Sequence, residues 1–156
     1  MRVDEEDWPG VGTWEVVRTR DAACALPITP DGDVLLVRQF RPAVRRHVLE
    51  APAGLLDVEG ESPEACAVRE LFEETGYRHN SLEAMAEIHT SVGHSSELVH
   101  LFLARIESEP RGKPEGGIEL VRMTFAEAVA GTRSGDIVDA KTALALLLAD
   151  GGTGAG

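Results

Sequence analysis

The chain has 156 residues, and its 27 acidic against 15 basic side chains give a formal charge of −12 at pH 7. This length suits one domain, and this charge disfavours nonspecific binding to nucleic acid or to an anionic membrane. The first ten residues lack the basic and apolar regions of a signal peptide, and no apolar run reaches the length of a membrane span. We therefore expect a cytoplasmic protein, in which Cys24 and Cys66 are buried reduced thiols.

The N-terminal part of the chain predicts strands joined by short turns. Residues 1–12 are acidic and contain Pro and Gly, which predicts an irregular lead-in. Apolar runs predict strands at 14–20, 22–28 and 34–37. The last two should form a hairpin, because Pro-Asp-Gly-Asp at 30–33 is a turn sequence.

A concentrated basic segment follows in this acidic chain. Its arginines, and the acid that closes it, are Arg38, Arg41, Arg45, Arg46 and Glu50. Ordinary surface arginines at strand ends are one interpretation. The other is a clamp for a diphosphate, since a guanidinium group binds phosphate oxygens bidentately.

The densest acidic stretch lies on a predicted helix. Ser62 suits the N-cap, Pro63 suits the first helical position and Gly76 suits the C-terminal stop. These signals predict a helix of about thirteen residues.

Three carboxylates share one side of that helix. Glu70 and Glu74 are four residues apart, and Glu73 is three residues from Glu70, so like charges crowd together. A solvated acidic face is the plainer interpretation. Clustered hard oxygen ligands also suit Mg²⁺ or Mn²⁺, which keep several waters and bridge to substrate phosphates.

The second half of the chain predicts three strands and two helices, with 79–82 as a connector. The strands are at 85–89, 98–106 and 118–124, and the helices are at 125–132 and 136–149. The polar loop 90–97 is similar in part to a serine-nucleophile turn, but Glu97 replaces the second glycine and no helix follows, so a serine hydrolase has poor support. Strands, one acidic helix, more strands and C-terminal helices together predict an α+β fold, a mixed α/β sandwich.

The segment from Arg69 to Tyr77 resembles the second half of the Nudix box, R-E-U-x-E-E-x-G-U, in which U is an apolar residue. Glu61 also lies eight residues before Arg69, as the box requires. One departure is that six residues separate Gly54 from Glu61, where the box has five. The extra residue falls in a polar loop, where it need not shift the helix.

The resemblance extends to the ADP-ribose pyrophosphatase branch of the Nudix family, through residues 34–41, 50–57 and 135–142. It implies a mixed sheet between helices, with the box forming a loop-helix-loop catalytic motif. We expect a single Nudix hydrolase domain at 13–150 and a flexible Gly-rich tail at 151–156.

The resemblance implies Mg²⁺ or Mn²⁺ as the cofactor. Glu70 and Glu74 correspond to metal ligands, Glu73 to a group that supports or shares a second ion, and the backbone carbonyl of Ala53 to a further oxygen ligand. Arg69 would orient the neighbouring carboxylates.

The resemblance also implies roles outside the box. Glu97 matches a loop Glu that activates or positions water, a task that falls to Glu73 in an alternative assignment. Weaker candidates for substrate contact are Arg38, Arg41, Arg45 and Glu50. The physical argument agrees, because water must attack phosphorus in line while metal ions neutralise the developing charge.

The implied reaction is hydrolysis of a nucleoside diphosphate linked to another moiety, for ADP-ribose giving AMP and ribose 5-phosphate. Val92, His94 and Ser96 depart from the usual loop of the branch, so hydrolysis of nucleoside triphosphates or dinucleoside polyphosphates is an alternative. A non-catalytic nucleotide-sugar sensor is another. We expect a small-molecule nucleotide as partner, no nucleic acid and no membrane, and a homodimer is one expected state. Trp8 and Trp14 are expected to pack within the fold, with the lining of an adenine pocket from the swapped side of a dimer as the alternative.

Overall fold

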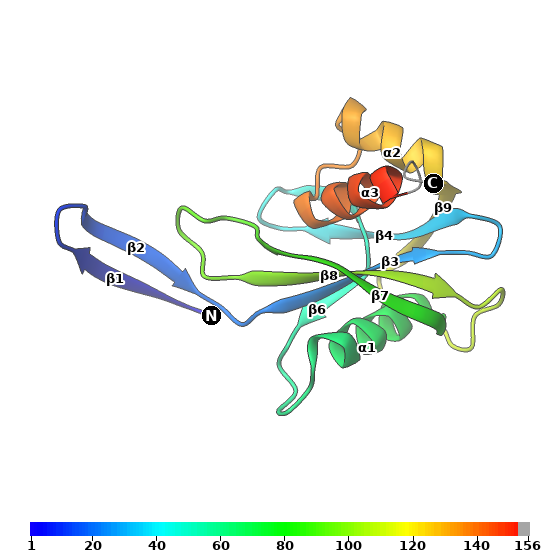
Figure 1. Ribbon diagram of the computed structural model, residues 1–156, viewed down its shortest axis with the longest axis horizontal. Helices are drawn as coiled ribbons and strands as arrows, with labels where there is room; N and C mark the ends of the chain where they lie inside the picture. Colours follow the sequence, from blue (N-terminus) through cyan, green and yellow to red (C-terminus); the bar gives the residue numbers. More distant parts are fainter. Residues whose placement is uncertain (153–156) are drawn as a thin grey trace.

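The computed structural model describes residues 1–152, which form a seven-stranded mixed sheet between helices and a separate N-terminal hairpin (Figure 1). The sheet has the order β5-β4-β3-β8-β7, with β6 paired to β3 and β9 paired to β4. Only β3 and β8 run parallel; the other pairs are antiparallel. Its strands are β3 (Ala22–Ile28), β4 (Asp33–Arg41), β5 (Arg46–Glu50), β6 (Ala53–Leu55), β7 (His79–His89), β8 (Leu98–Ile106) and β9 (Glu119–Thr124).

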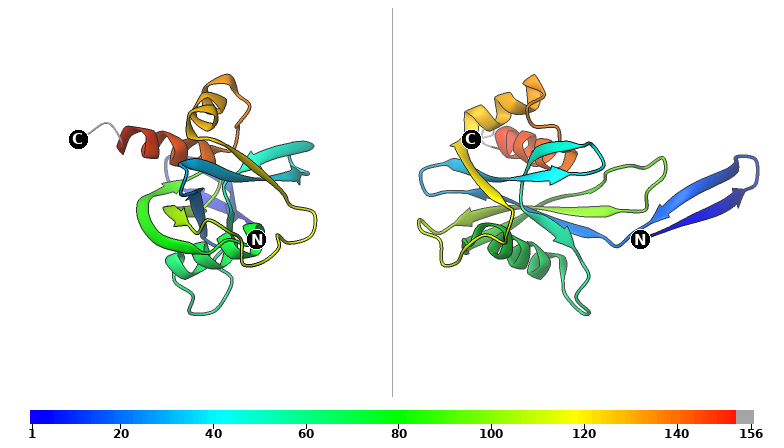
Figure 2. Two further views of the ribbon diagram at one scale, coloured as in Figure 1. Left: turned by 90° about the vertical axis from the view of Figure 1, so that its right-hand side faces the viewer. Right: turned by 180° about the vertical axis from the view of Figure 1, so that it is seen from behind.

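Helix α1 (Pro63–Thr75) covers one face of the sheet, and α2 (Phe125–Ser134) and α3 (Ala140–Gly152) cover the other (Figures 1 and 2). This arrangement confirms the α+β sandwich. The predicted limits of α1 are also confirmed, because the Ser62 side chain accepts from Ala65 N at 3.2 Å and Gly76 ends the helix with φ 76°. A side chain at Gly76 would also meet the carbonyl oxygen of Gly112 at 2.5 Å.

Strand β3 lies at the centre and supplies both cores. Leu26 and Ile28 face α2 and α3, whereas Ala23 and Ala25 face α1. The small alanines let α1 pack closely, so its buried face, Cys66, Ala67 and Leu71, reaches the sheet. This packing fixes the position of the acidic side of α1 relative to the loops that flank β6.

Residues 1–12 are not the irregular lead-in that composition predicts. They contain β1 (Arg2–Trp8), which pairs with β2 (Gly12–Arg18) in a hairpin that projects from the body (Figure 1). Cross-strand partners explain the difference, because Arg18 pairs with Asp4 and Glu6. The Pro-Gly sequence is the hairpin turn.

Other boundaries differ from the sequence predictions. Residues 79–82 begin β7 instead of forming a connector, and the last helix begins at Ala140, not at 136. The predicted hairpin of β3 and β4 keeps one register pair, Ile28 with Val34, and the start of β3 pairs with β6 instead. Trp8 and Trp14 do not pack within the fold, since 55% and 48% of their surfaces are exposed.

The C-terminal end of the chain is helical up to Gly152. Within the predicted tail at 151–156, Gly151 and Gly152 end α3, and 153–156 lie outside the described residues. Cys24 and Cys66 are buried free thiols, as predicted. None of the helices in the described chain is long and apolar enough to cross a membrane.

Candidate active site

Arg69 organises the acidic side of α1. Its Nε and Nη2 donate to the two carboxylate oxygens of Glu61, both at 2.9 Å. Its Nη1 donates to Glu70 at 2.6 Å and to Glu73 at 3.1 Å. These hydrogen bonds raise the pKa of Arg69 and lower the pKa of Glu61. One guanidinium group therefore fixes three carboxylates, as the resemblance implies.

Glu70 lies directly over the backbone of β6. A Cβ atom at Gly54 would be 2.6 Å from Glu70 Oε2 and closer still to Oε1 and Cδ, so only glycine leaves room for this carboxylate. Burial raises the pKa of Glu70, although the hydrogen bond from Arg69 opposes that effect. The sequence signal for this contact was the Gly at the start of the box.

Glu74 is the most buried carboxylate of the helix, with 8% of its surface exposed. It accepts from Gln39 Nε2 at 2.8 Å and from the backbone N of Ala53 at 3.2 Å. Burial raises its pKa to about 7. The two hydrogen bonds lower that pKa, but neither donor carries a charge, so they do not offset the effect of burial. Gln39 was not among the predicted site residues, although it lies within the basic segment.

The donor set fits a hard divalent cation. Glu70 and Glu74 lie against consecutive residues of β6, Gly54 and Ala53, so both carboxylates are near the same short strand. In residues 1–152 no group of three or more His, Cys, Asp or Glu side chains is placed so that it could hold a metal ion. Arg69 donates hydrogen bonds to Glu70 and Glu73. Mg²⁺ commonly keeps several waters and needs only one or two carboxylates, so an open set suits it.

A second charged group faces this cluster from β4, β5 and α3. Glu50 is 3% exposed, and it accepts from Arg41 at 2.5 and 2.7 Å and from Lys141 Nζ at 2.7 Å. Lys141 also binds Asp139 at 2.8 Å. Burial alone would raise the pKa of Glu50, but Arg41 and Lys141 hold that pKa below its ordinary value. Lys141 was missed as a site residue because it lies 91 residues from Glu50.

The predicted water-activating residue, Glu97, lies in the loop between β7 and β8. Its carboxylate accepts from Thr90 Oγ1 at 2.7 Å, and its carbonyl oxygen is 2.8 Å from His89 Nδ1. A cavity of about 450 Å³ brings Glu97 together with the β6 loop and the basic group; its lining includes Arg41, Ala53, Gly54, Glu97 and Lys141. A volume of this size suits a small ligand.

Three predicted substrate contacts, Arg38, Arg45 and Glu50, lie outside the lining of that cavity. Arg38 pairs with Glu119 of β9 at 3.8 Å. Arg45 is in the turn between β4 and β5, with φ 56°. Of the four candidates, the structure therefore brings Arg41 to the cavity directly and Glu50 through its hydrogen bonds to Arg41 and Lys141.

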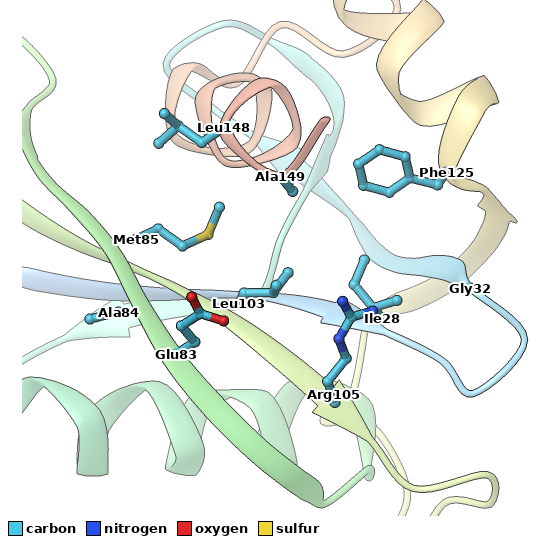
Figure 3. Close-up of a pocket in the computed structure, with 10 residues that line it drawn as sticks. All are labelled: Ile28, Gly32, Glu83, Ala84, Met85, Leu103, Arg105, Phe125, Leu148 and Ala149. Atoms are coloured by element: carbon cyan, nitrogen blue, oxygen red, sulfur yellow. The ribbon is translucent and has the colours of Figure 1, made fainter. Parts of the chain in front are cut away.

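A larger cavity, of about 520 Å³, lies at the other end of the sheet (Figure 3). The two cavities lie at opposite ends of β3. Ile28, the last residue of that strand, lines the larger cavity, and Ala22, the first residue, lines the smaller cavity that contains Glu97. Met85, Leu103 and Phe125 make the wall of the larger cavity mostly apolar (Figure 3). None of the predicted site residues lines it, whereas Arg41, Ala53 and Glu97 line the smaller cavity, which is therefore the candidate active site.

Comparison with known proteins agrees with this geometry. A model of the NUDIX domain matches residues 18–144. The ADP-ribose pyrophosphatase of Bacillus subtilis (strain 168) is 37% identical over 136 residues, which cover 85% of this chain and 73% of that protein. The GDP-mannose pyrophosphatase of Cronobacter sakazakii is 41% identical over 140 residues, covering 83% and 72%.

A third relative carries a name of a different kind. The methanol dehydrogenase activator of Bacillus methanolicus is 32% identical over 152 residues, which cover 94% of this chain and 82% of that protein. The domain match spans most of the chain, and all three relatives exceed 30% identity over most of their length. The chain therefore belongs to the Nudix hydrolase family.

Proposed function

We propose that this Nudix hydrolase cleaves the diphosphate bond of ADP-ribose and releases AMP and ribose 5-phosphate, with Mg²⁺ or Mn²⁺ as the cofactor. Nudix hydrolases generally need a divalent metal ion. The observation that carries the proposal is the juxtaposition, around one cavity, of Arg41 and Lys141 with the Gly54 backbone that Glu70 covers. A diphosphate needs both kinds of partner, since cations bind its oxygens while carboxylates hold the metal that bridges them.

The hydrogen bonds of the two basic side chains leave donors for substrate. Arg41 uses Nε and Nη2 on Glu50, so Nη1 stays available for a phosphate oxygen. Lys141 uses two of its three ammonium protons, on Glu50 and Asp139. Glu50 thus holds the side chains of Arg41 and Lys141 in place, and we assign it a positioning role.

The acidic groups take the remaining roles. Bound metal would neutralise the diphosphate and the charge that develops during attack by water. Glu70 and Glu74 would hold that metal, with the carbonyl oxygen of Ala53, and Glu73 would support it. Glu97 would accept the proton of the attacking water, and its hydrogen bond from Thr90 fixes the carboxylate for that task.

A second candidate substrate is GDP-mannose, favoured by the relative of that name at 41% identity. Nucleoside triphosphates and dinucleoside polyphosphates are a further candidate class. The activator name of the third relative makes a non-catalytic sensor worth testing as well.

The test is a substrate panel assayed with Mg²⁺, with Mn²⁺ and with chelator, with products identified by chromatography. Metal-dependent release of AMP and ribose 5-phosphate is expected. Turnover of GDP-mannose alone would keep the site and change the substrate. Tight binding of one nucleotide sugar without turnover of any panel member would contradict the proposal and favour the sensor.

We also propose a homodimer in which the N-terminal hairpin contacts the second copy. Trp8 and Trp14, which are 55% and 48% exposed, lie on that projecting hairpin, where a partner would remove apolar surface from water. Light scattering of the purified protein is expected to give twice the 16.7 kDa chain mass. A monomer at micromolar concentration would contradict it.

A further inference from the structure

We propose that the base of the N-terminal hairpin, residues 17–21, is a positioning element for Glu97. This inference rests on the proposed function, in which Glu97 accepts a proton from water. The hairpin itself adds no residue to the lining of the candidate active site. Its base nevertheless holds the loop that carries Glu97.

Two backbone hydrogen bonds tie Val17 to that loop. Val17 N donates to His94 O at 2.7 Å, and Ser96 N donates to Val17 O at 3.0 Å. The result is a short parallel bridge between Val17 and Ser95. Thr19 N adds a longer hydrogen bond to Ser96 Oγ at 3.3 Å.

The orientation of Val17 follows from the register of the hairpin. Val17 lies opposite Val3, and antiparallel pairs alternate between those that exchange hydrogen bonds and those that do not. Both the N–H and the C=O of Val17 bind the loop, so Val17 and Val3 exchange no hydrogen bonds with each other. The edge of β2 that β1 leaves free is thus used by the Glu97 loop.

The loop has few other restraints. Within the described part of the chain, hydrogen bonds from residues 91–96 to distant segments end only on Val17 and Thr19. The others are local, such as His94 N to Ser91 O at 3.2 Å. Val92 is 85% exposed, so packing does little to fix the loop. The hairpin base is therefore its main long-range support on the side that precedes Glu97.

The same segment also contacts the loop that follows β6. Leu56 N donates to Asp21 O at 2.9 Å, and Asp21 Oδ1 accepts from Leu98 N at 3.3 Å. Arg20 Nη1 donates to Asp57 O at 3.3 Å. Residues 17–21 thus join the backbone beside Glu97 to the backbone beside Gly54, and they set the spacing between the proposed base and the proposed metal ligands.

The test substitutes Val17→Pro, which removes the N–H that binds His94 but spares the hydrogen bonds between β1 and β2. Glu15→Pro is the matched control. It lies on the same strand and the same edge, two residues away, and it is exposed. Both variants perturb the hairpin, but only Val17→Pro breaks the bridge to the loop.

We expect Val17→Pro to lower kcat by about 10-fold or more with KM within about twofold, because misplacing a reacting group by about 1 Å is costly. Glu15→Pro is expected to stay within about twofold of wild type. In a Glu97→Gln background, Val17→Pro should lower kcat by less than about twofold, since the group that it positions has lost its function. An equal loss in both backgrounds would overturn the inference.

Hydrogen exchange measures how firmly Val17 holds the loop before Glu97, without any assay of activity. The Ser96 amide should exchange about 10-fold faster in Val17→Pro than in Glu15→Pro. If Val17→Pro fails to fold, Ser96→Ala removes the acceptor of Thr19 and should lower kcat in wild type but not in Glu97→Gln. If the Ser96 amide exchanges at the same rate in Val17→Pro and in Glu15→Pro, the positioning role is overturned, even for an inactive protein. If wild type shows no turnover but the exchange rates differ as expected, only the proposed function is overturned.

Discussion

Gly54 offers a direct test of how closely the acidic helix approaches β6. In Gly54→Ala, the new Cβ would lie 2.6 Å from Glu70 Oε2 and nearer to the other carboxylate atoms. An ordinary contact needs at least about 3.4 Å, so the carboxylate must move by more than about 0.8 Å. The backbone of Gly54 adds no strain, because its φ is not positive.

This displacement should affect activity and stability very differently. The atoms that must move belong to the far end of a flexible side chain, so the fold can adapt at small cost. The active site cannot adapt, since a shift of about 1 Å in a catalytic array lowers the rate by about 100-fold. We therefore expect kcat/KM for ADP-ribose to fall by about 100-fold while the melting temperature changes little.

The assay compares Gly54→Ala with Gly116→Ala at saturating Mg²⁺. Gly116 is a fair control, because a Cβ there has no heavy atom within 4 Å and its φ is also not positive. Gly116→Ala should match wild type. A folded Gly54→Ala enzyme with wild-type kcat/KM would refute the placement of Glu70 over β6.

Two further variants test the buried charges. Glu74→Gln should reduce turnover by at least about 100-fold, and in chelator at pH 8 it should melt at a higher temperature than wild type. Burial raises the pKa of Glu74 from its ordinary value of 4.5 to about 7, so its ionisation lowers the stability of the fold as pH rises from about 4.5 to about 7, and the full penalty is present at pH 8. An equal or lower melting temperature would count against that burial. Glu50→Ala should cost about 3 kcal/mol in the free energy of unfolding at pH 7, because Arg41 and Lys141 lose their shared partner. Since the pKa of Glu50 is lowered, its contribution is present at neutral pH and is lost below about pH 4; denaturant titrations at pH 7 and pH 3 that give the same difference would contradict this assignment.

Local signals accounted for the acidic helix and for much of its chemistry. Ser62, Pro63 and Gly76 define the ends of α1 through contacts within a few residues, so sequence alone predicts them. The pairing of Arg69 with Glu73, four residues later, follows from helical spacing in the same way.

Contacts between distant segments could not be predicted from spacing. Lys141 reaches Glu50 across 91 residues, and Thr19 reaches Ser96 across 77. Only the topology, which places the start of α3 beside β5 and the hairpin base beside the Glu97 loop, brings these groups together. The resemblance covered residues 135–142, including Lys141, but gave no role to that lysine.

The first strand of the N-terminal hairpin, β1, was missed for another reason. It is acidic and mostly exposed, so the apolar alternation that marks a half-buried strand is weak. The hairpin depends on cross-strand pairs such as Arg18 with Glu6 and on glycines in its turn, Gly10 and Gly12, with positive φ. Composition alone indicated an irregular segment where these pairs make a strand.

The decisive experiment follows product release from ADP-ribose by chromatography, as Mg²⁺ is titrated into the purified protein and then removed by chelator. AMP and ribose 5-phosphate should form in equal amounts, only while the divalent ion is present, and at least about 100-fold more slowly in Glu74→Gln. Release of AMP at the same rate in chelator, or by Glu74→Gln, would contradict a metal-dependent site on the acidic helix.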